Sequence, residues 1–508
     1  KMASLIAPFA NENPEQIALV DDFGETSWSD FNGRVNQLVH ALRSKGLRTG
    51  DAFAVVSGNR REYFEAFAAA AHGGWLLVPV NWHLVAKEVA YILADSGSKA
   101  LLVDSRFIEL AEATMLQTER PNLEAVVIMG KEASVFADET EQAIAYEDFL
   151  SEQSSAEPGD QLLGGPMFYT SGTTGHPKGV KSGLSQTGAP VEMLKMIGDG
   201  ISAMLGITPG GKSLLVGPVY HSAQWAFSFL PLLAGTSVVM RHRFDGEEVL
   251  KLVDKYQITN IHLVPTQFTR MLRLSDDIRK SFNGSSLTAV WHGAAPCPPQ
   301  IKRQMIEWWG PVINEYYGST EGSIVTTVSA EDWLSRPGTL GKPVPIMEIL
   351  VIKEDGSRAS AGESGTLYVK NLMGSDFEYH NAPEKTSDAH LEPGVFTFGD
   401  VGYLDEDGYL FMSDRKIDMI ISGGVNIYPA EIEGTLIDHP AVLDAAVFGV
   451  PNEEFGEEVK AAVELAEGIQ ASEQLTEDLM SHCREQLAGF KVPRSVDYED
   501  QLPRHPTG

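Results

Sequence analysis

The stretch Phe168–Gly179 reads FYTSGTTGHPKG. Four Ser/Thr hydroxyls and three glycines surround a single lysine. Glycines let backbone N–H groups come close to a phosphate, hydroxyls donate to its oxygens, and the lysine adds a positive charge. The composition alone also fits a surface loop. The common phosphate loop needs Ser or Thr directly after its lysine. Here Gly179 follows Lys178, so the stretch predicts a phosphate loop of a different kind.

Four further motifs follow along the chain. They are Trp291–Pro296 (WHGAAP), Asn314–Glu321 (NEYYGSTE), Thr397–Asp400 (TFGD) and Asp414–Gly424 (DRKIDMIISGG). Together with the phosphate loop, and in the same order, they resemble the signature motifs of the acyl-adenylate-forming enzymes. That superfamily contains acyl-CoA synthetases, luciferases and the adenylation domains of peptide synthetases, and the chain is most similar to fatty-acid and aromatic-acid–CoA ligases. The resemblance spans nearly the whole chain.

The pattern of apolar residues predicts an α/β fold. Apolar strands separated by helical patterns indicate parallel sheets covered on both faces by helices. Ser27–Asp30 has the form of a capping box and predicts the start of a helix. Expected strands cover residues 52–57, 75–80, 100–103, 213–216, 237–240, 260–264 and 289–292. Expected helices cover residues 62–71, 85–94, 223–233, 246–256 and 266–274. Residues 132–159 are expected to be irregular, and the short strands and turns of 338–411 indicate a small β-subdomain.

The resemblance also implies a division into domains. Residues 1–413 form a large adenylation domain that holds ATP and the acyl pocket. Residues 414–417 form the hinge, and residues 418–508 form a small, mobile α+β C-terminal domain. The usual hinge position is Ile417, where the family commonly has Asp or Lys. An apolar side chain cannot make the polar contacts of a charged one, and Ile417 equally fits a core position.

By resemblance, three side chains surround the nucleotide. Tyr317 stacks on adenine, Asp400 accepts from the ribose hydroxyls, and Thr320 contacts the α-phosphate. A carboxylate suits two neighbouring hydroxyls, although the family often has Thr where Phe398 stands. The full implied set of ATP-binding residues is Thr170, Ser171, Gly172, Thr173, Thr174, Gly175, Lys178, Gly293, Ala294, Ala295, Asn314, Glu315, Tyr316, Tyr317, Gly318, Ser319, Thr320, Asp400 and Arg415.

The resemblance implies Mg²⁺ as a cofactor, with Thr174 and Glu321 as its ligands. Mg²⁺ prefers oxygen ligands, and it is usually bound through one or two carboxylates and the phosphates of the substrate. The implied catalytic residues are His221, Thr320, Glu321 and Lys178. The segment Leu502–Gly508 matches the approach to the adenylation lysine of the family, which is therefore expected after Gly508.

The acyl pocket is expected after the motif strands. Its candidate residues are His221, Trp225, Phe227, Val264, Phe268, His292 and Gly293, several of which equally fit core positions. By resemblance His221 gates the pocket, and a structural role is the alternative. Ser422, Gly423 and Gly424 resemble the loop that meets the pantetheine arm of coenzyme A. Lys491 resembles a second lysine of the small domain but also fits a surface position.

Composition excludes several classes of protein. The 508-residue chain has 70 acidic and 39 basic residues and a net charge of −31, which argues against a nucleic-acid partner. Its two cysteines, Cys297 and Cys483, do not have the spacing of a metal site or a disulfide framework. We expect a cytoplasmic protein with no signal peptide and no membrane span. Peripheral membrane contact and a homodimer remain open.

These observations predict an acyl-CoA synthetase that uses ATP and coenzyme A. No basic or acidic residue is placed to pair with a second carboxylate or an amino group of the substrate, which favours a fatty, aromatic or polycyclic acid. The alternatives are an adenylating enzyme with another acceptor and a non-catalytic nucleotide or acyl-CoA sensor. A kinase or ordinary nucleoside triphosphatase is disfavoured by the missing Gly-Lys-Ser/Thr, and a serine hydrolase by the lack of Gly-x-Ser-x-Gly.

Overall fold

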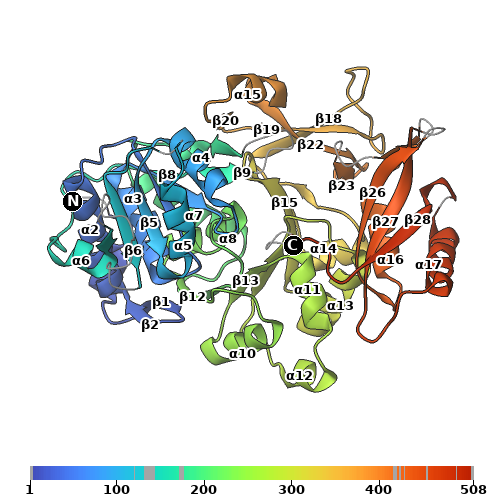
Figure 1. The fold of residues 1–508 in the computed structure, drawn as a ribbon, viewed down its shortest axis with the longest axis horizontal. Helices are drawn as coiled ribbons and strands as arrows, with labels where there is room; N and C mark the ends of the chain where they lie inside the picture. The colour runs from blue at the N-terminus through green and yellow to red at the C-terminus, as the bar shows by residue number, and fades with distance from the viewer. Residues whose placement is uncertain are drawn as a thin grey trace.

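The computed structural model divides into sheet-based parts that mostly follow one another along the chain (Figure 1), except that residues 17–27 add two strands to the second sheet. It describes residues 4–118, 121–130, 143–170, 177–415, 420–422, 425–427, 429–452, 456–487 and 489–504. Two helix-covered sheets form the N-terminal and middle parts, a β-rich part follows, and an α+β unit ends the chain. The predicted fold class is therefore confirmed. Within the described ranges, no helix combines the length and apolar character needed to cross a bilayer.

The first sheet has six parallel strands in the order β7-β6-β5-β3-β4-β8. The strands are Ile144–Ala145, Ala125–Met129, Ser98–Asp104, Ala52–Val56, Leu76–Val80 and Gly165–Pro166. Neighbouring residues of β3 face opposite cores, with Phe53 and Val55 in one and Ala54 and Val56 in the other. Both faces of this sheet are therefore buried. The covering helices are α2 (Trp28–Ser44), α3 (Arg61–Gly73), α4 (Ala86–Ser96) and α5 (Ile108–Met115).

The second sheet has nine strands in the order β17-β16-β15-β14-β13-β11-β12-β1-β2. Its strands are Lys342–Pro343, Ser323–Val328, Ile313–Ser319, Ala289–His292, Asn260–Leu263, Lys212–Leu215, Ser237–Met240, Ile17–Asp21 and Gly24–Ser27. The run from β15 to β1 is parallel, and the strands at both edges are antiparallel. Its helices include α7 (Glu192–Met204), α10 (Gly246–Tyr256), α11 (Pro265–Leu272), α12 (Asp276–Ser281), α13 (Pro299–Trp309) and α14 (Ala330–Ser335).

Several predicted elements are found with small shifts at their ends. Ser27 caps α2, because its side chain accepts from the backbone N–H of Asp30 at 3.0 Å. The prediction of irregular chain over 132–159 is wrong in part, since α6 (Tyr146–Ser151) lies there. This helix forms because Tyr146, Phe149 and Leu150 are buried against the core that includes α2.

The single helix predicted over 223–233 is also wrong, because the structure has two short helices. They are α8 (Ser222–Ala226) and α9 (Phe229–Leu233). Pro231 lacks the N–H that would donate to the carbonyl of Phe227, and its ring would clash with that carbonyl. The first helix therefore ends at Ala226, and the second begins at Phe229.

Residues 338–411 lie in the β-rich part, as predicted. Four strands run in the order β18-β19-β22-β21, and β23 pairs with β22. These strands are Met347–Ile352, Gly365–Asn371, Val395–Leu404, His390–Glu392 and Leu410–Arg415. A separate three-stranded sheet joins this part to the phosphate loop, in the order β20 (Glu378–Tyr379), β10 (Lys178–Lys181) and β9 (Phe168–Thr170). The helix α15 (Pro383–Ala389) follows β20.

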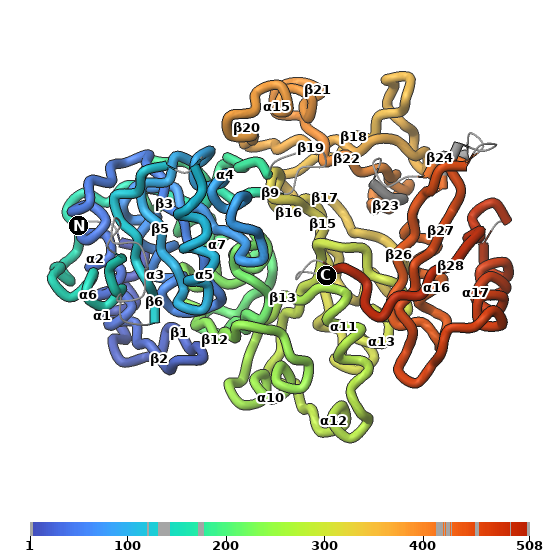
Figure 2. Tube along the Cα trace, viewed as in Figure 1, coloured from blue at the N-terminus to red at the C-terminus, as the bar shows by residue number. Residues whose placement is uncertain are grey.

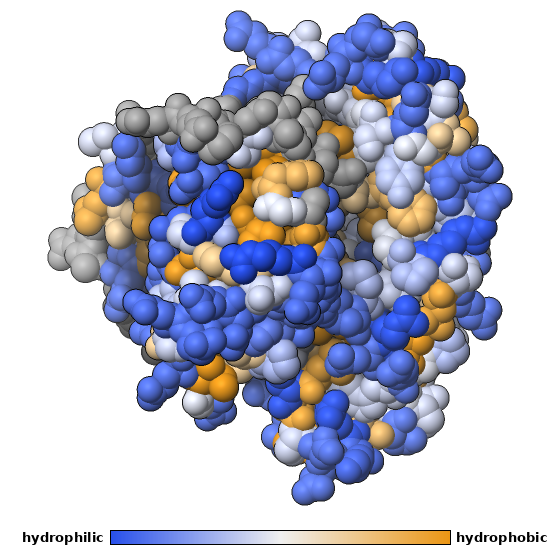
Figure 3. Space-filling model, turned by 90° about the vertical axis from the view of Figure 1, so that its right-hand side faces the viewer, coloured by the Kyte–Doolittle hydropathy of each residue, from blue (hydrophilic) through white to orange (hydrophobic). Residues whose placement is uncertain are grey.

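The C-terminal unit is a five-stranded sheet with two helices. Its strands are β24 (Ile420–Ser422), β25 (Val425–Ile427), β26 (Val442–Asn452), β27 (Gly456–Leu465) and β28 (Ser495–Glu499), and its helices are α16 (Pro429–Ile437) and α17 (Glu473–Gln486). Its core is continuous. Its exposed large apolar side chains are Phe448, Ile469 and Phe490, and Figure 3 shows apolar areas on this side of the molecule bordered by hydrophilic residues.

A few polar contacts join the C-terminal unit to the middle part. The guanidinium of Arg273, directly after α11, donates to the carbonyl of Leu443 at 2.8 Å and to that of Val442 at 3.3 Å. Within the C-terminal unit, Arg504 pairs with Asp444 of β26 at 2.8 Å. The chain after β28 thus runs back along β26 toward α13 and α11 (Figure 2).

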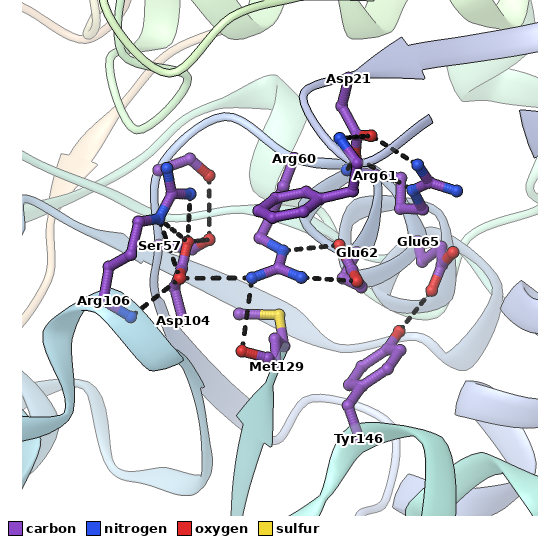
Figure 4. A network of polar contacts seen from close by, with 12 residues as sticks. Asp21, Ser57, Arg60, Arg61, Glu62, Glu65, Asp104, Arg106, Met129 and Tyr146 are labelled. Atoms are coloured by element: carbon purple, nitrogen blue, oxygen red, sulfur yellow. Dashed lines mark hydrogen bonds and ion pairs between the residues drawn. The ribbon is translucent and has the colours of Figure 1, made fainter. Parts of the chain in front are cut away.

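The carboxyl edge of the six-stranded sheet is filled by ion pairs (Figure 4). Asp104, at the end of β5, accepts from Arg106, from Ser57 and, at 3.2 Å, from Arg60. Arg60 also forms a bidentate pair with Glu62 at 2.7 and 2.8 Å. The side chains of Arg60 and Asp104 are almost fully buried. This edge therefore neutralises its own charges.

Candidate active site

The carboxyl edge of the nine-stranded sheet carries two of the predicted motifs. The strands β14 and β15 are parallel neighbours, with His292 opposite Glu315. Their ends lead into Gly293–Ala295 and Gly318–Glu321, so the two motifs lie side by side. At Gly293 a side chain would be impossible without movement, since a Cβ there would lie 2.7 Å from the Tyr316 carbonyl oxygen and from its ring. Ala294 has a φ of 68°. The chain is thus held tightly where a planar ligand is expected.

The phosphate loop is framed by two paired strands. The strands β9 and β10 are antiparallel, and Thr170 is opposite Lys178. The predicted residues Ser171, Gly172, Thr173, Thr174 and Gly175 lie outside the described residues. The pKa of Lys178 is lowered to about 8, first by burial and then by the nearby Lys385 ammonium, while Glu321 opposes the shift. Two ammonium groups therefore lie close together beside the loop.

The adenine and ribose candidates are in direct contact. The hydroxyl of Tyr317 donates to Oδ2 of Asp400 at 2.6 Å, although the two residues are 83 positions apart. Asp400 lies on β22, opposite Arg415 of β23; the side chain of Arg415 is outside the described set. The Phe398 ring lies 6.0 Å from the Tyr317 ring. The structure thus brings the two residues together, and their roles toward a nucleotide remain predictions.

Thr320, the phosphate candidate, and Glu321, the metal candidate, each form a hydrogen bond with a hydroxyl group from another segment. The hydroxyls of Thr320 and Ser222 are 2.8 Å apart, and Ser222 directly follows His221. The hydroxyl of Tyr379 donates to Oε1 of Glu321 at 2.9 Å. Burial, followed by the charge of Glu321, raises the pKa of Tyr379, so its hydroxyl keeps its proton at neutral pH. Ser222 and Tyr379 are not in the predicted set.

Glu321 fits the implied Mg²⁺ in its chemistry. It is a carboxylate that is only partly buried, and a hydroxyl fixes one of its oxygens. The described residues contain no group of three or more His, Cys, Asp or Glu side chains that could hold a metal ion by themselves. Mg²⁺ usually needs only one or two carboxylates when the substrate supplies phosphate oxygens and water completes the shell. One carboxylate beside a phosphate loop is therefore compatible with a metal that arrives with ATP.

A buried ion pair lies beneath the two motifs. Nζ of Lys302, on α13, lies 2.6 Å from Oε2 of Glu315 and 4.7 Å from the Trp333 ring centroid. His292 Nε2 lies 3.6 Å from the same oxygen. Burial raises the pKa of Glu315 and lowers the pKa values of Lys302 and His292. The carboxylate of Glu315 is thus occupied within the protein, and its predicted contact with ATP stays a prediction. The sequence offered no spacing signal for Lys302.

A chain of hydrogen bonds links α8 to β15. Nε2 of Gln224 donates to Nδ1 of His262 at 2.9 Å, and Nε2 of His262 lies 3.1 Å from the Tyr316 hydroxyl. Because Nδ1 accepts, the neutral ring carries its proton on Nε2 and donates to Tyr316. Burial lowers the pKa of His262 to about 3. The helix that follows His221 is thus held to the nucleotide motif at two points.

Most of the predicted acyl-pocket residues are fully packed. Trp225 lies among Phe67, Phe168 and Phe229. The other aromatic candidates pack beside the motifs: Phe227 contacts His262, Trp291 and Tyr316, and Phe268 packs edge-on against His292. Val264 is buried directly after β13. The part of the chain that the structure describes places these residues around the motifs, while their contact with an acid remains a prediction.

The predicted coenzyme A and hinge residues are only partly described. Ser422 ends β24 and is opposite Val425 and Gly456. Gly423, Gly424 and Ile417 lie outside the described residues. Lys491 pairs with Glu431 at 2.5 Å, so it contacts a carboxylate of its own unit.

Comparison with known proteins identifies the family. A model described as AMP-binding enzyme matches residues 7–373, and one described as AMP-binding enzyme C-terminal domain matches residues 431–508. A relative from Bacillus subtilis (strain 168), named 2-succinylbenzoate–CoA ligase, is 30% identical over 498 residues, covering 98% of this chain and 94% of the relative. A relative from Rhodococcus jostii (strain RHA1), a CoA ligase named for a methyl-dioxo-octahydroindenyl propanoate, is 33% identical over 515 residues and covers 98% of this chain and 95% of its own.

A solved structure agrees with the whole fold. The anthranilate CoA ligase AuaEII in complex with anthranoyl-AMP superposes with a TM-score of 0.87 at 25% identity, covering 100% of this chain and 95% of that one. The family models and this match cover both the sheets that carry the motifs and the C-terminal unit. The chain therefore belongs to the AMP-binding enzyme family, whose acyl-adenylate-forming members its five motifs resemble.

Proposed function

We propose that this protein is an acyl-CoA synthetase that activates an apolar carboxylic acid with ATP and transfers the acyl group to coenzyme A. The observation that carries the proposal is the convergence of residues from three separate motifs: Lys178 from the first, Tyr317, Thr320 and Glu321 from the second, and Asp400 from the third. Tyr317 contacts Asp400 directly, and Tyr379 contacts both Lys178 and Glu321, which supports a nucleotide site built from these residues. The relatives are CoA ligases for chemically different acids, which supports the ligase class and leaves the acid to experiment.

In the first step, a carboxylate oxygen attacks the α-phosphorus, and the bond from that phosphorus to the bridging oxygen of pyrophosphate breaks. Tyr317 and Asp400 hold the nucleoside, and Thr320 donates to an α-phosphate oxygen. Lys178 binds the departing pyrophosphate. These groups act mainly by position and charge, as expected for phosphoryl chemistry. A magnesium ion held by Glu321 and the phosphates would neutralise charge on the leaving group.

In the second step, the thiolate of coenzyme A attacks the acyl carbon, and the bond from that carbon to the phosphate oxygen breaks. AMP leaves, and the thioester remains. The two steps need different groups at one site, which favours a domain rotation about residues 414–417. In this proposal Ser422, Gly423 and Gly424 face the pantetheine arm in the second step. An apolar hinge residue, Ile417, would then bring few polar contacts to either orientation.

Product analysis tests this proposal. The full chain is incubated with MgATP, coenzyme A and acids of graded size, from acetate to long fatty acids and polycyclic acids, and the products are identified by mass. We expect acyl-AMP, pyrophosphate and acyl-CoA with at least one apolar acid. Acyl-AMP without thioester would redirect the proposal to another acceptor. Nucleotide binding with no acid-dependent pyrophosphate release would favour the sensor instead.

A further inference from the structure

Tyr379 contacts two of the predicted functional residues at once. Its hydroxyl donates to Oε1 of Glu321 at 2.9 Å. Its ring lies beneath the ammonium of Lys178, with 5.1 Å from Nζ to the ring centroid. Glu321 follows β15, whereas Lys178 begins β10, so a single side chain links residues of two different sheets.

The backbone around Tyr379 is fixed on both sides. Tyr379 is opposite Val180 in the β20–β10 pair, and its N–H donates to the Thr386 hydroxyl at 2.9 Å. The next N–H, that of His380, donates to the carbonyl of Gly179 at 2.7 Å. The Tyr379 side chain is thus carried by the same short sheet that carries Lys178.

A second layer of contacts holds this segment to the six-stranded part. Asp95, at the end of α4, accepts at 2.7 Å from the hydroxyl of Tyr169, which lies on β9. The backbone carbonyl of Asp95 lies 3.0 Å from His380 Nε2 and accepts from Asn381 at 3.1 Å. Both sides of the phosphate loop are thereby joined to the segment that carries Tyr379.

We propose that Tyr379 is a positioning residue that holds the Glu321 carboxylate and the Lys178 ammonium in one fixed geometry, using its hydroxyl for the first and its ring face for the second. The proposal rests on the proposed function, in which Glu321 faces the metal and Lys178 the pyrophosphate. Partners that orient a metal-binding carboxylate strongly affect metal affinity, and an aromatic face attracts an ammonium. The two effects reside in different atoms of one side chain, so they can be separated.

The test measures equilibrium binding to the full chain. Tyr379→Phe keeps the ring and removes the hydroxyl, whereas Tyr379→Leu removes both. The affinity for ATP is measured calorimetrically in EDTA, and binding of Mn²⁺ to the ATP complex is measured by electron paramagnetic resonance. For Tyr379→Phe we expect Mn²⁺ affinity to fall by about tenfold or more, with unchanged affinity for metal-free ATP. For Tyr379→Leu we expect the same loss and, in addition, a fall of about threefold in the affinity for metal-free ATP.

Tyr409 provides the matched control. Nζ of Lys342 lies 4.5 Å from its ring centroid, so Tyr409→Leu removes a similar stacked lysine contact in the β22–β23 turn. Neither affinity should change in this variant. The double variant Tyr379→Phe with Glu321→Gln should bind Mn²⁺ no more weakly than Glu321→Gln alone, since the hydroxyl acts through that carboxylate.

Two results would overturn the inference. Wild-type Mn²⁺ affinity in Tyr379→Phe would exclude the role of the hydroxyl, and equal affinities for metal-free ATP in the Phe and Leu variants would exclude that of the ring. A wild-type protein that binds MgATP but never releases pyrophosphate would sink the proposed function instead. The binding results with Tyr379 would still be interpretable in that case.

Discussion

The two parallel sheets differ in what fills their carboxyl edges. At the six-stranded sheet, Asp104 lies among Arg60, Arg106 and Ser57, and Arg60 is completed by Glu62. At the nine-stranded sheet, the corresponding edge has hydroxyl-to-carboxylate contacts and two lysines close to one another. Open α/β sheets bind ligands at this edge. The first edge is thus closed by charges of its own, whereas the second is the edge at which we propose that a charged ligand binds.

The largest effect on stability is expected from removing a buried charge at the carboxyl edge of the six-stranded sheet. Asp104→Ala removes the fully buried carboxylate that two arginines share. Removing one partner of a buried pair typically costs about 3–5 kcal/mol. We therefore expect the free energy of unfolding, measured in urea, to fall by about that amount, while ATP affinity of the folded protein stays the same.

The control for this variant is Asp160→Ala. Asp160 pairs with Arg43 at 2.7 Å, but its side chain is 79% exposed. Exposed pairs contribute about 0–1 kcal/mol, so the stability of the control should barely change. If Asp104→Ala lowered the free energy of unfolding no more than Asp160→Ala does, or weakened ATP binding, the ion pairs at the edge of the six-stranded sheet would not have a purely structural role.

The stability of the second edge is expected to depend on pH through the buried His262. Burial lowers its pKa to about 3, against about 6.5 in an unfolded chain. The native state therefore prefers the neutral ring. Its stabilising contribution is complete above pH 6.5, and it is lost as pH falls from 6.5 toward 3, because the unfolded chain binds a proton that the native chain does not.

We expect His262→Gln to flatten the pH dependence of stability between pH 6.5 and 4 by about 1.4 kcal/mol per pH unit. Urea unfolding at several pH values measures this slope. His72 and His242, whose pKa values burial lowers to about 4, contribute with the same sign and keep part of the slope. An unchanged slope in His262→Gln would show that this ring is not kept neutral by the fold.

Replacing Asp400 is expected to lower the affinity for ATP without lowering the stability of the fold. Asp400→Asn keeps an acceptor for the Tyr317 hydroxyl but loses the charge and one acceptor for the ribose. Hydrogen bonds to charged groups are worth about 1.5–3 kcal/mol, so ATP affinity should fall roughly ten- to hundredfold, with little change in unfolding. Calorimetric titration measures the affinity, and the exposed Asp388→Asn of α15 is the control. A large loss of stability with normal ATP affinity would show that Asp400 supports the fold and not nucleotide binding.

The sequence predicted the parts of this comparison that depend on local pattern. Apolar runs placed β3, β12 and β14 closely, because strands buried on both faces are continuous in hydrophobicity. The motifs placed Tyr317 and Asp400 in one site. The break at Phe227 was missed, although Pro231 carried the signal, because the apolar residues around it read as one helix.

The remainder depends on contacts between residues distant in sequence. Tyr379 and Glu321 are 58 positions apart, and Ser222 and Thr320 are 98 apart. Lys302 meets Glu315 only because α13 packs on the strand that follows it. A single tyrosine, serine or lysine has no period or spacing that marks such a partner. The composition of the first edge likewise gave no sign that its arginines and carboxylates would pair with one another.

The smallest effect is expected from replacing Ser222. This variant tests whether the edge of the nine-stranded sheet orients a hydrogen-bond donor, the Thr320 hydroxyl, as well as its carboxylate acceptors. The hydroxyls of Ser222 and Thr320 are 2.8 Å apart, and either can donate. Thr320 can donate to an α-phosphate oxygen only when Ser222 supplies the proton of their mutual bond. Ser222→Ala therefore leaves Thr320 without that donor, whereas Ser222→Thr keeps it. With a net value of about 0.5–1.5 kcal/mol for one hydrogen bond, we expect the kcat for acyl-AMP formation to fall roughly two- to tenfold in the alanine variant and to recover in the threonine variant.

The matched control is Thr208→Ala, because Thr208 and Thr288 form an exposed hydroxyl pair at 3.1 Å away from the motifs. If alanine at 222 raised the KM for ATP and left kcat unchanged, the bond would serve ground-state binding, and the second edge would be organised for holding the nucleotide rather than for its reaction.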